Sequence, residues 1–367
     1  MSLEAEFKKL KSSAVDLKSM KYAQWTDAAL YPDADEENLE QVNPVALSRD
    51  WQSFGQQIIN YAASKAIQSL FPIGKAFFKI DLTKDSLELA AESLGYEADE
   101  VARELVDAAN EACKLLHWKG NYSRLTWAAK VAFVTGNVLF VYRKDGSLIP
   151  YTTRSYVVKR DGSGAMLKLI LKERQAYRML PPSVQAGFSG KSHEDMVDVY
   201  HCAEWQAIEA DGTQMVKLWQ EAGTWKSDSE DVRSEVCPYI PVAIEVTPGE
   251  SYGRGRVEAN AGDFARYSEL SRALTLYEIE ACKVVNAVRP GSGSDTDALN
   301  SAESGEYVSA DPDAIKAMEF GDGRKIAEIR NELMAIEQRL ARTFGYGANM
   351  RDAERVEVVL VALYKLL

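Results

Sequence analysis

Three short polar runs contain side chains of the kinds that bind metal ions. Residues 193–195 read His-Glu-Asp, residues 295–297 read Asp-Thr-Asp, and residues 311–313 read Asp-Pro-Asp. Imidazole and carboxylate groups bind zinc, and paired carboxylates hold hard cations such as calcium. One polar turn rarely supplies a complete metal site, however, and Asp pairs in loops more often cap turns. We therefore expect no metal, no other cofactor and no catalytic residue.

Sequence patterns of two common enzyme classes are missing. GxxxxGK[ST] and HExxH do not occur, which argues against an ATP-driven motor and against metalloproteases of the HExxH type. The glycine-bearing runs at 253–256 and 291–294 do not match a dinucleotide-binding fingerprint. A hydrolase built on dispersed carboxylates stays an alternative, although the sequence offers no acidic pair for it.

The charge of the chain bears on nucleic-acid binding. Its 55 acidic residues outnumber its 43 basic residues, for a net charge of −12, whereas tight binding to DNA requires clustered Lys and Arg. From this charge we expect at most weak contact with DNA. Trp205, Trp219 and Trp225 could form a base-stacking platform, but we expect them to pack in the core or at an interface.

The four cysteines are Cys113, Cys202, Cys237 and Cys282. They are far apart in the sequence, which argues against a zinc site or a disulfide scaffold.

The spacing of apolar residues predicts an α+β fold up to about Pro248. Helical periodicity covers residues 51–71, 84–116 with a break at Gly95, and 123–134. Strands are predicted from β-branched runs and from Asp-Gly turns. They cover about 77–82, 138–143, 155–159, 165–171, 196–205, 215–219 and 239–246, with a short helix near 173–179.

The second half of the chain has a different character. Residues 255–288 contain no proline, and their apolar stripe predicts one helix of about 50 Å. A small module follows, with strands near 306–309 and 317–320, and then a helix over 325–344. This order indicates two antiparallel helices with the module at their far end. Residues 125–142 are the most membrane-like stretch but are interrupted by polar residues, so we expect no membrane span.

Six segments, in order along nearly the whole chain, resemble the portal proteins (head-to-tail connectors) of short-tailed bacteriophages of the T-odd type. None is a chemical motif alone, but their common order is specific. They are Leu-Phe-Pro at 70–72, Gly-Asn-Val-Leu at 136–139, Ser-Tyr-Val-Val-Lys-Arg-Asp at 155–161, Cys-Pro-Tyr-Ile-Pro at 237–241, Gly-Glu-Ser-Tyr-Gly-Arg-Gly at 249–255 and Met-Arg-Asp-Ala-Glu-Arg-Val at 350–356.

The resemblance implies a portal fold with an α/β wing, a stem of long helices and a small α/β clip. The wing is expected at 1–248, the first stem helix at 249–288, the clip at 289–323 and the second stem helix at 324–344. Residues 345–354 are expected to form the channel loop. The family's crown is missing from this sequence, so we expect 355–367 to be the truncated or incomplete start of the crown-side helix.

The resemblance also implies a function. The chain is expected to form a homododecamer at one capsid vertex of the virion, assembled in the host cytoplasm. Double-stranded DNA is expected to pass through this ring in packaging and ejection. Expected partners are the large terminase subunit, the tail adaptor, and the major capsid, scaffolding and internal core proteins. Tyr346, Asn349 and Arg351 are expected in the DNA-channel loop, with Arg342 beside it. The alternative for Arg342 and Arg351 is that they lie at a solvated helix end. The alternative function of the chain is that of an oligomeric helical adaptor or scaffold without a DNA channel.

Overall fold

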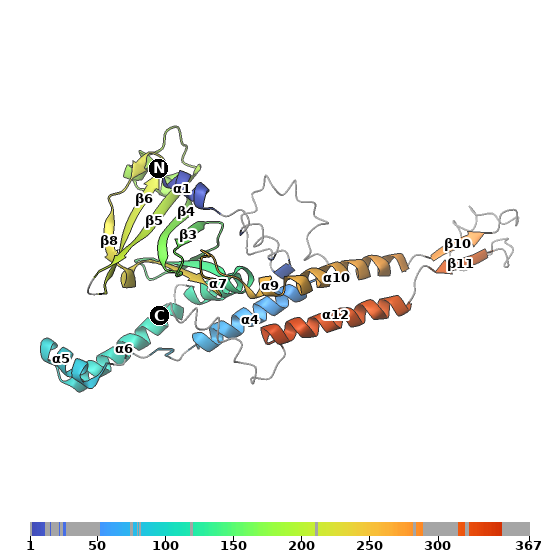
Figure 1. Cartoon of the computed structure of the whole chain (residues 1–367), viewed down its shortest axis with the longest axis horizontal. Helices are drawn as coiled ribbons and strands as arrows, with labels where there is room; N and C mark the ends of the chain where they lie inside the picture. The colour runs from blue at the N-terminus through green and yellow to red at the C-terminus, as the bar shows by residue number, and fades with distance from the viewer. Residues whose placement is uncertain are drawn as a thin grey trace.

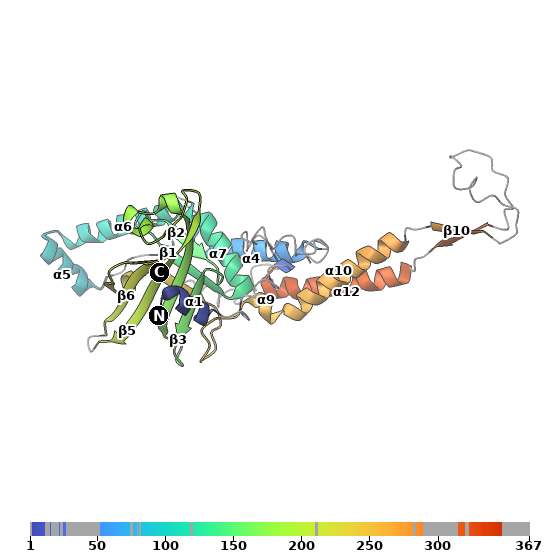
Figure 2. The same cartoon turned by 90° about the horizontal axis from the view of Figure 1, so that it is seen from above.

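The computed structural model describes residues 2–11, 15, 22, 25–26, 52–73, 76–78, 80, 82–117, 120–209, 212–281, 284–288, 315–319 and 323–346. Figure 1 shows an elongated molecule with a two-helix arm at one end, a body of strands and helices, and a pair of long helices leading to a two-stranded hairpin at the other end. Figure 2 shows the same order from above.

Two antiparallel sheets form one side of the body. The strands are β1 (Asn137–Tyr142), β2 (Leu148–Tyr151), β3 (Tyr156–Arg160), β4 (Met166–Ala176), β5 (Met196–Ile208), β6 (Gln214–Ala222), β7 (Trp225–Lys226), β8 (Glu230–Arg233) and β9 (Tyr239–Ala243). The smaller sheet has the order β2-β1-β9, and the larger has the order β3-β4-β5-β6-β7, with β8 also paired to β6.

Alternation along the strands gives the larger sheet two buried faces. Leu169 and Leu171 of β4 point toward the smaller sheet and share a core cluster with Leu139 of β1. Ile170, between them, belongs to a cluster on the opposite face with Phe7 of α1 (Leu3–Leu10). Because successive side chains of a strand point to opposite faces, the apolar run in β4 serves both layers.

The helices of the body share the largest core. They are α4 (Phe54–Leu70), α7 (Asn121–Thr135), α9 (Arg256–Ala259) and the near ends of α10 (Ala261–Ala281) and α12 (Gly323–Phe344). The rings of Phe264 and Phe344 meet edge to face at 5.9 Å between centroids, so α10 and α12 are anchored where they leave the body. Between α4 and α7 the chain adds the arm, α5 (Lys84–Leu94) and α6 (Ala98–His117).

The body passes into the helix pair through a close crossing of two backbone segments. Gly136 adopts φ 75° between α7 and β1, and a Cβ there would overlap the carbonyl group of Arg254. The buried Asn137 side chain donates to Gly253 O at 2.8 Å, and Gly253 N–H donates back to Asn137 Oδ1 at 2.7 Å. We call the contact of 136–137 with 253–255 the junction. It joins two of the segments that carry the family resemblance.

Most of the predicted elements are confirmed, with shifted ends. The helix at 51–71 is α4, the break at Gly95 falls between α5 and α6, and the helix at 325–344 is α12. The helix expected from Ser123 begins instead after Gly120. The short helix predicted near 173–179 is wrong for most of its length, since β4 continues to Ala176 before a 3-10 turn. The strand at 77–82 is also wrong: the described residues there form none.

The single helix predicted over 255–288 is interrupted at Asn260, between α9 and α10, and is wrong at its C-terminal end. Its long part is α10, which ends at Ala281, and Val284–Val288 is a strand, β10, paired antiparallel with β11 (Ile315–Glu319). The spacing of four between Val284 and Val288 fits a helix, but it is also an even number and fits a strand. The β-branched residues and the presence of a partner strand favour the strand. At 21 residues, α10 is about 31 Å long.

Several expected features lie outside the described residues: the strand at 306–309 and most of 289–323, most of the loop at 345–354, and residues 355–367. In the part of the chain that the structure describes, no helix is both long enough and apolar enough to cross a membrane.

Replacing Asn137 with Ala should destabilise the fold by at least about 2 kcal/mol, because two buried backbone groups of Gly253 lose their hydrogen-bond partner. Urea unfolding of the purified protein measures the change. Asn331→Ala on the exposed surface of α12 is the matched control and should stay within about 0.5 kcal/mol of wild type. Equal effects of the two variants would contradict a structural role for the junction.

Candidate functional site

The helix pair α10 and α12 leads to the segment in which channel residues are expected, with Arg342 on α12 and Tyr346 two residues after it. Its apolar seam includes Phe264 on α10 and Leu333, Ile336 and Leu340 on α12, all of which are buried. Polar contacts flank the seam and cross from helix to helix. They are Arg339–Asp263 at 2.8 Å, Tyr267–Glu337 at 2.7 Å, Arg266–Glu332 at 3.0 Å and Arg330–Glu278 at 2.7 Å.

These crossings fix the antiparallel register of the two helices more than they stabilise them. The arginine side chains are about half exposed or more, and exposed ion pairs contribute roughly 0–1 kcal/mol each. The pair as a whole is electrically balanced, because α10 and α12 together contain seven acidic and seven basic residues. A neutral pair of helices attracts phosphates weakly.

The structure places two of the four expected channel residues at the body end of α12. Arg342 is exposed to solvent. Tyr346 is half-buried and meets Tyr61 and Phe54 of α4 edge to face, with ring centroids 5.1 Å and 6.3 Å apart. Tyr346 thus packs the chain against α4 after the helix ends. Asn349 and Arg351 lie outside the described residues.

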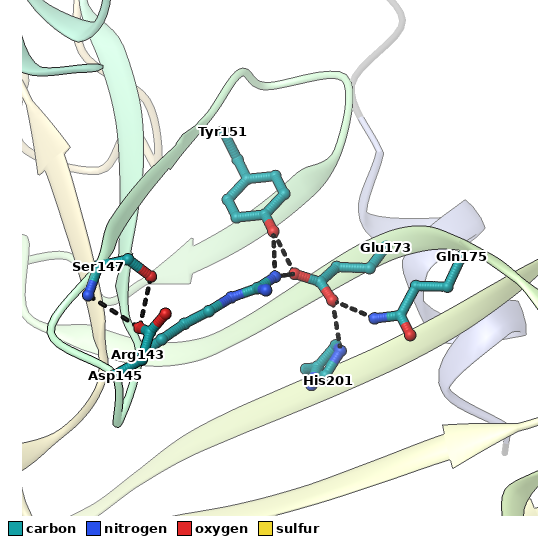
Figure 3. A network of polar contacts seen from close by, with 7 residues as sticks. All are labelled: Arg143, Asp145, Ser147, Tyr151, Glu173, Gln175 and His201. Carbon is teal, nitrogen blue, oxygen red and sulfur yellow. Dashed lines mark hydrogen bonds and ion pairs between the residues drawn. The ribbon is translucent and has the colours of Figure 1, made fainter. Parts of the chain in front are cut away.

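A cluster of polar and ionisable side chains lies between the two sheets (Figure 3). The Glu173 carboxylate on β4 accepts a hydrogen bond from Arg143 at 3.1 Å and another from Tyr151 through one oxygen. Gln175 donates to the other oxygen at 2.6 Å, and His201 Nε2 on β5 lies 3.4 Å from that oxygen. Arg143 follows β1 and Tyr151 ends β2, so Glu173 ties the smaller sheet to the larger one.

The pKa of Glu173 shows that this carboxylate stays ionised. Burial alone would raise its pKa, but His201 and the hydrogen bonds from Tyr151 and Gln175 outweigh burial and lower it to about 2. The pKa of Tyr151 is raised, by burial and by the adjacent carboxylate, so the phenol remains a donor. With both oxygens of Glu173 in use, the cluster is best explained as a structural tie between the sheets.

Sequence reasoning missed this cluster, although a signal was present. Glu173 follows Leu169 and Leu171 at steps of two along β4 and therefore shares their inward face. Only 8% of Glu173 is exposed, and a buried carboxylate needs partners. The nearby Asp145 side chain accepts from the backbone N–H and the hydroxyl of Ser147, at 2.9 Å and 2.6 Å, which shapes the β1–β2 turn that carries Arg143.

The residues first considered for metal binding and stacking have other contacts. Asp195 accepts hydrogen bonds from the backbone and the hydroxyl of Ser192, both at 3.0 Å, and Glu194 pairs with Arg178 at 3.3 Å. No group of three potential metal ligands occurs among the described residues, and the Asp pairs at 295–297 and 311–313 lie outside them. Trp205, Trp219 and Trp225 each pack against a different hydrophobic cluster, as expected for core packing.

Comparison with known proteins identifies relatives over nearly the whole chain. The family model described as "Bacteriophage head to tail connecting protein" matches residues 8–362. The portal protein of Pseudomonas phage phiKMV is 34% identical over 361 residues, which cover 95% of this chain and 68% of that protein. The portal protein of Escherichia phage T7 is 27% identical over 351 residues, 91% of this chain.

The chain is shorter than these relatives and spans only 62% of the T7 portal protein. Among solved structures, a chain from the virion of a native gene transfer agent particle aligns with 81% of this chain and 75% of its own length, at 9% identity and a TM-score of 0.36. A TM-score at this level does not establish a shared fold.

Replacing Glu173 with Gln should reduce the loss of stability in acid. The folded pKa of about 2 lies below the ordinary 4.5, so the carboxylate stabilises the wild-type fold above pH 4.5 and loses this effect as the pH falls toward 2. A shift of that size corresponds to at most about 3 kcal/mol. Unfolding free energies measured between pH 7 and pH 2.5 test this, with the exposed Glu235→Gln as control. The same acid dependence in wild type and Glu173→Gln would contradict the role of the carboxylate.

Proposed function

The chain belongs to the family of bacteriophage head-to-tail connecting proteins, and we propose that it forms a ring whose central channel carries double-stranded DNA in packaging and ejection. The observation that carries the proposal is the arrangement of the second half of the chain. Two long antiparallel helices leave the body together and lead to a two-stranded hairpin at the far end (Figures 1 and 2).

In this proposal residues 1–248, which include the arm and both sheets, are the wing, and α10 and α12 are the stem. The β10–β11 hairpin and the chain between its strands are the clip, which begins near residue 284 because α10 ends at Ala281. The loop at 345–354 reaches the channel from the end of α12. The family resemblance and the order of these elements along the chain support the assignment.

Simple geometry is consistent with a channel of the required width. Twelve helices about 9 Å apart around a circle have their axes on a diameter of about 35 Å. Subtracting about 10 Å for the thickness of the helices leaves an opening of about 25 Å. A hydrated DNA duplex fits such an opening with little room to spare.

The charges of the stem suit conduction. A channel that held many phosphates with Lys and Arg would bind DNA tightly and slow its movement, whereas α10 and α12 contain equal numbers of acidic and basic residues. We assign transient phosphate contacts to Arg342, which is exposed at the end of α12, and to Asn349 and Arg351 in the loop. Tyr346 has a different part, since its ring anchors the base of this loop against α4.

The proposal also covers the binding partners of the ring and its location in the virion. The ring is a homododecamer at one capsid vertex of the virion and assembles in the host cytoplasm. The clip receives the large terminase subunit during packaging and the tail adaptor afterwards, while the wing contacts the major capsid, scaffolding and internal core proteins. The protein conducts DNA passively, and the terminase supplies the energy.

Purified protein should form rings with a stain-filled centre and about twelve-fold symmetry in negative-stain electron microscopy, because stem helices packed side by side close into a circle. An oligomer without a hole would support a helical adaptor or scaffold instead. A monomer at high concentration, from a chain of verified mass, would contradict the proposal and return an enzymatic role to consideration.

A further inference from the structure

The two-helix arm, α5 and α6, combines exposure with an unusual concentration of charge. In both views α5 lies at the end of the molecule opposite to β10 and β11 (Figures 1 and 2). Residues 84–117 contain nine acidic and three basic residues, a net charge of −6. About a tenth of the chain therefore carries half of its net charge of −12.

Large apolar side chains stand in solvent among these acidic groups. Leu94 and Tyr96 flank the turn at Gly95 and are 61% and 63% exposed, and Leu89 on α5 is 73% exposed. Val106 on α6 is 46% exposed. The backbone of the turn is well made, since Tyr96 N–H donates to Ala91 O at 3.1 Å, so the exposure of these side chains does not come from an unformed turn.

The arm buries little of its own surface. Of its side chains whose burial is described, only four are buried, and three of them are small: Ala91, Val101, Ala109 and Cys113. Isolated helices shorter than about 12–15 residues are marginally stable in water, and α5 has 11 residues. Contact with α6 supports this short helix, and further apolar contact with a partner would stabilise it more.

We propose that the arm is a docking surface for a partner protein whose contact face is basic around an apolar centre. The carboxylates attract such a face and set its orientation, and Leu89, Leu94 and Tyr96 supply the desolvated contacts that contribute most to affinity. The arm of a second copy is a poor occupant, because its own excess of acidic residues would bring like charges together. DNA is anionic and is repelled in the same way. The inference goes beyond the channel function and does not depend on it.

A defined probe tests the proposal: a fluorescein-labelled 18-residue helical peptide of Leu and Lys, titrated into the full chain in its native oligomeric state and followed by fluorescence anisotropy. Binding should weaken as salt increases. A peptide of the same charge, with Ser in place of Leu, should bind at least about tenfold more weakly, because it lacks the apolar contacts.

Three variants locate the site. Leu89→Ser with Tyr96→Ser removes two exposed apolar groups and should raise the Kd of the Leu–Lys peptide at least about tenfold. Glu88→Gln, Glu92→Gln and Asp107→Asn together remove exposed charges of the arm and should weaken binding and its salt dependence. The matched control neutralises three exposed acidic residues of the sheet region, Asp228, Glu230 and Glu235. It should leave the Kd within about twofold of wild type.

Three results would overturn the proposal. If the apolar variant binds like wild type, or the sheet-region control loses as much affinity as the arm variant, the peptide is held by diffuse charge. If the apolar variant changes the oligomeric mass in native mass spectrometry, the arm is a contact between copies of this chain. The oligomeric mass also separates this test from the channel proposal. If the protein forms rings but the arm does not bind the peptide, only the docking proposal is contradicted.

Discussion

Asn137 and Gly253 exchange hydrogen bonds at the point where the sheet region passes into the helix pair, and the direction of the helix pair relative to the body depends on this contact. The backbones approach so closely that a Cβ at Gly136 would overlap main-chain atoms of Arg254 and Gly255, and a Cβ at Gly255 would overlap those of Val134 and Gly136. Close backbone packing of this kind permits one arrangement and resists small displacements. In the proposed ring, a small error in the angle between the body and the helix pair would be repeated in every subunit.

The ionisable groups are distributed in a way that suits three different tasks. Between the sheets, the Glu173 carboxylate with its partners joins two layers that also share an apolar core. Along α10 and α12, balanced charge sets the register of the helices and leaves the pair neutral. On the arm, excess negative charge surrounds exposed apolar groups. The net charge of −12 is therefore a poor description of any one part of the molecule.

The sequence allowed most elements to be predicted, because long apolar periodicities and Asp-Gly turns are local signals. Its failures have physical causes. Val284 and Val288 satisfy both helical and strand spacing, and only the partner strand at 315–319, distant in sequence, decides between them. Glu173 looked like a surface residue because its partners Arg143, Tyr151 and His201 come from three other strands or turns. The segments at 136–139 and 249–255 carried the family resemblance, but only the structure shows that they touch.

The candidate channel residues show the same limit. Arg342 and Tyr346 are four positions apart at the end of one helix, and sequence reasoning gave them a common role. In the structure Arg342 faces solvent, while Tyr346 packs on Tyr61 and Phe54. Side chains of neighbouring positions acquire different tasks from the elements packed against them, and here α4 makes the difference.

A cryo-electron microscopy reconstruction of the purified oligomer would show whether α10 and α12 surround a DNA channel, as we propose. We expect a closed ring in which the α10–α12 pairs stand around the central opening, with Arg342 at its edge and the sheets and arms outside. A ring lined by the sheets, or an assembly with the helix pairs on its outer surface, would contradict this proposal.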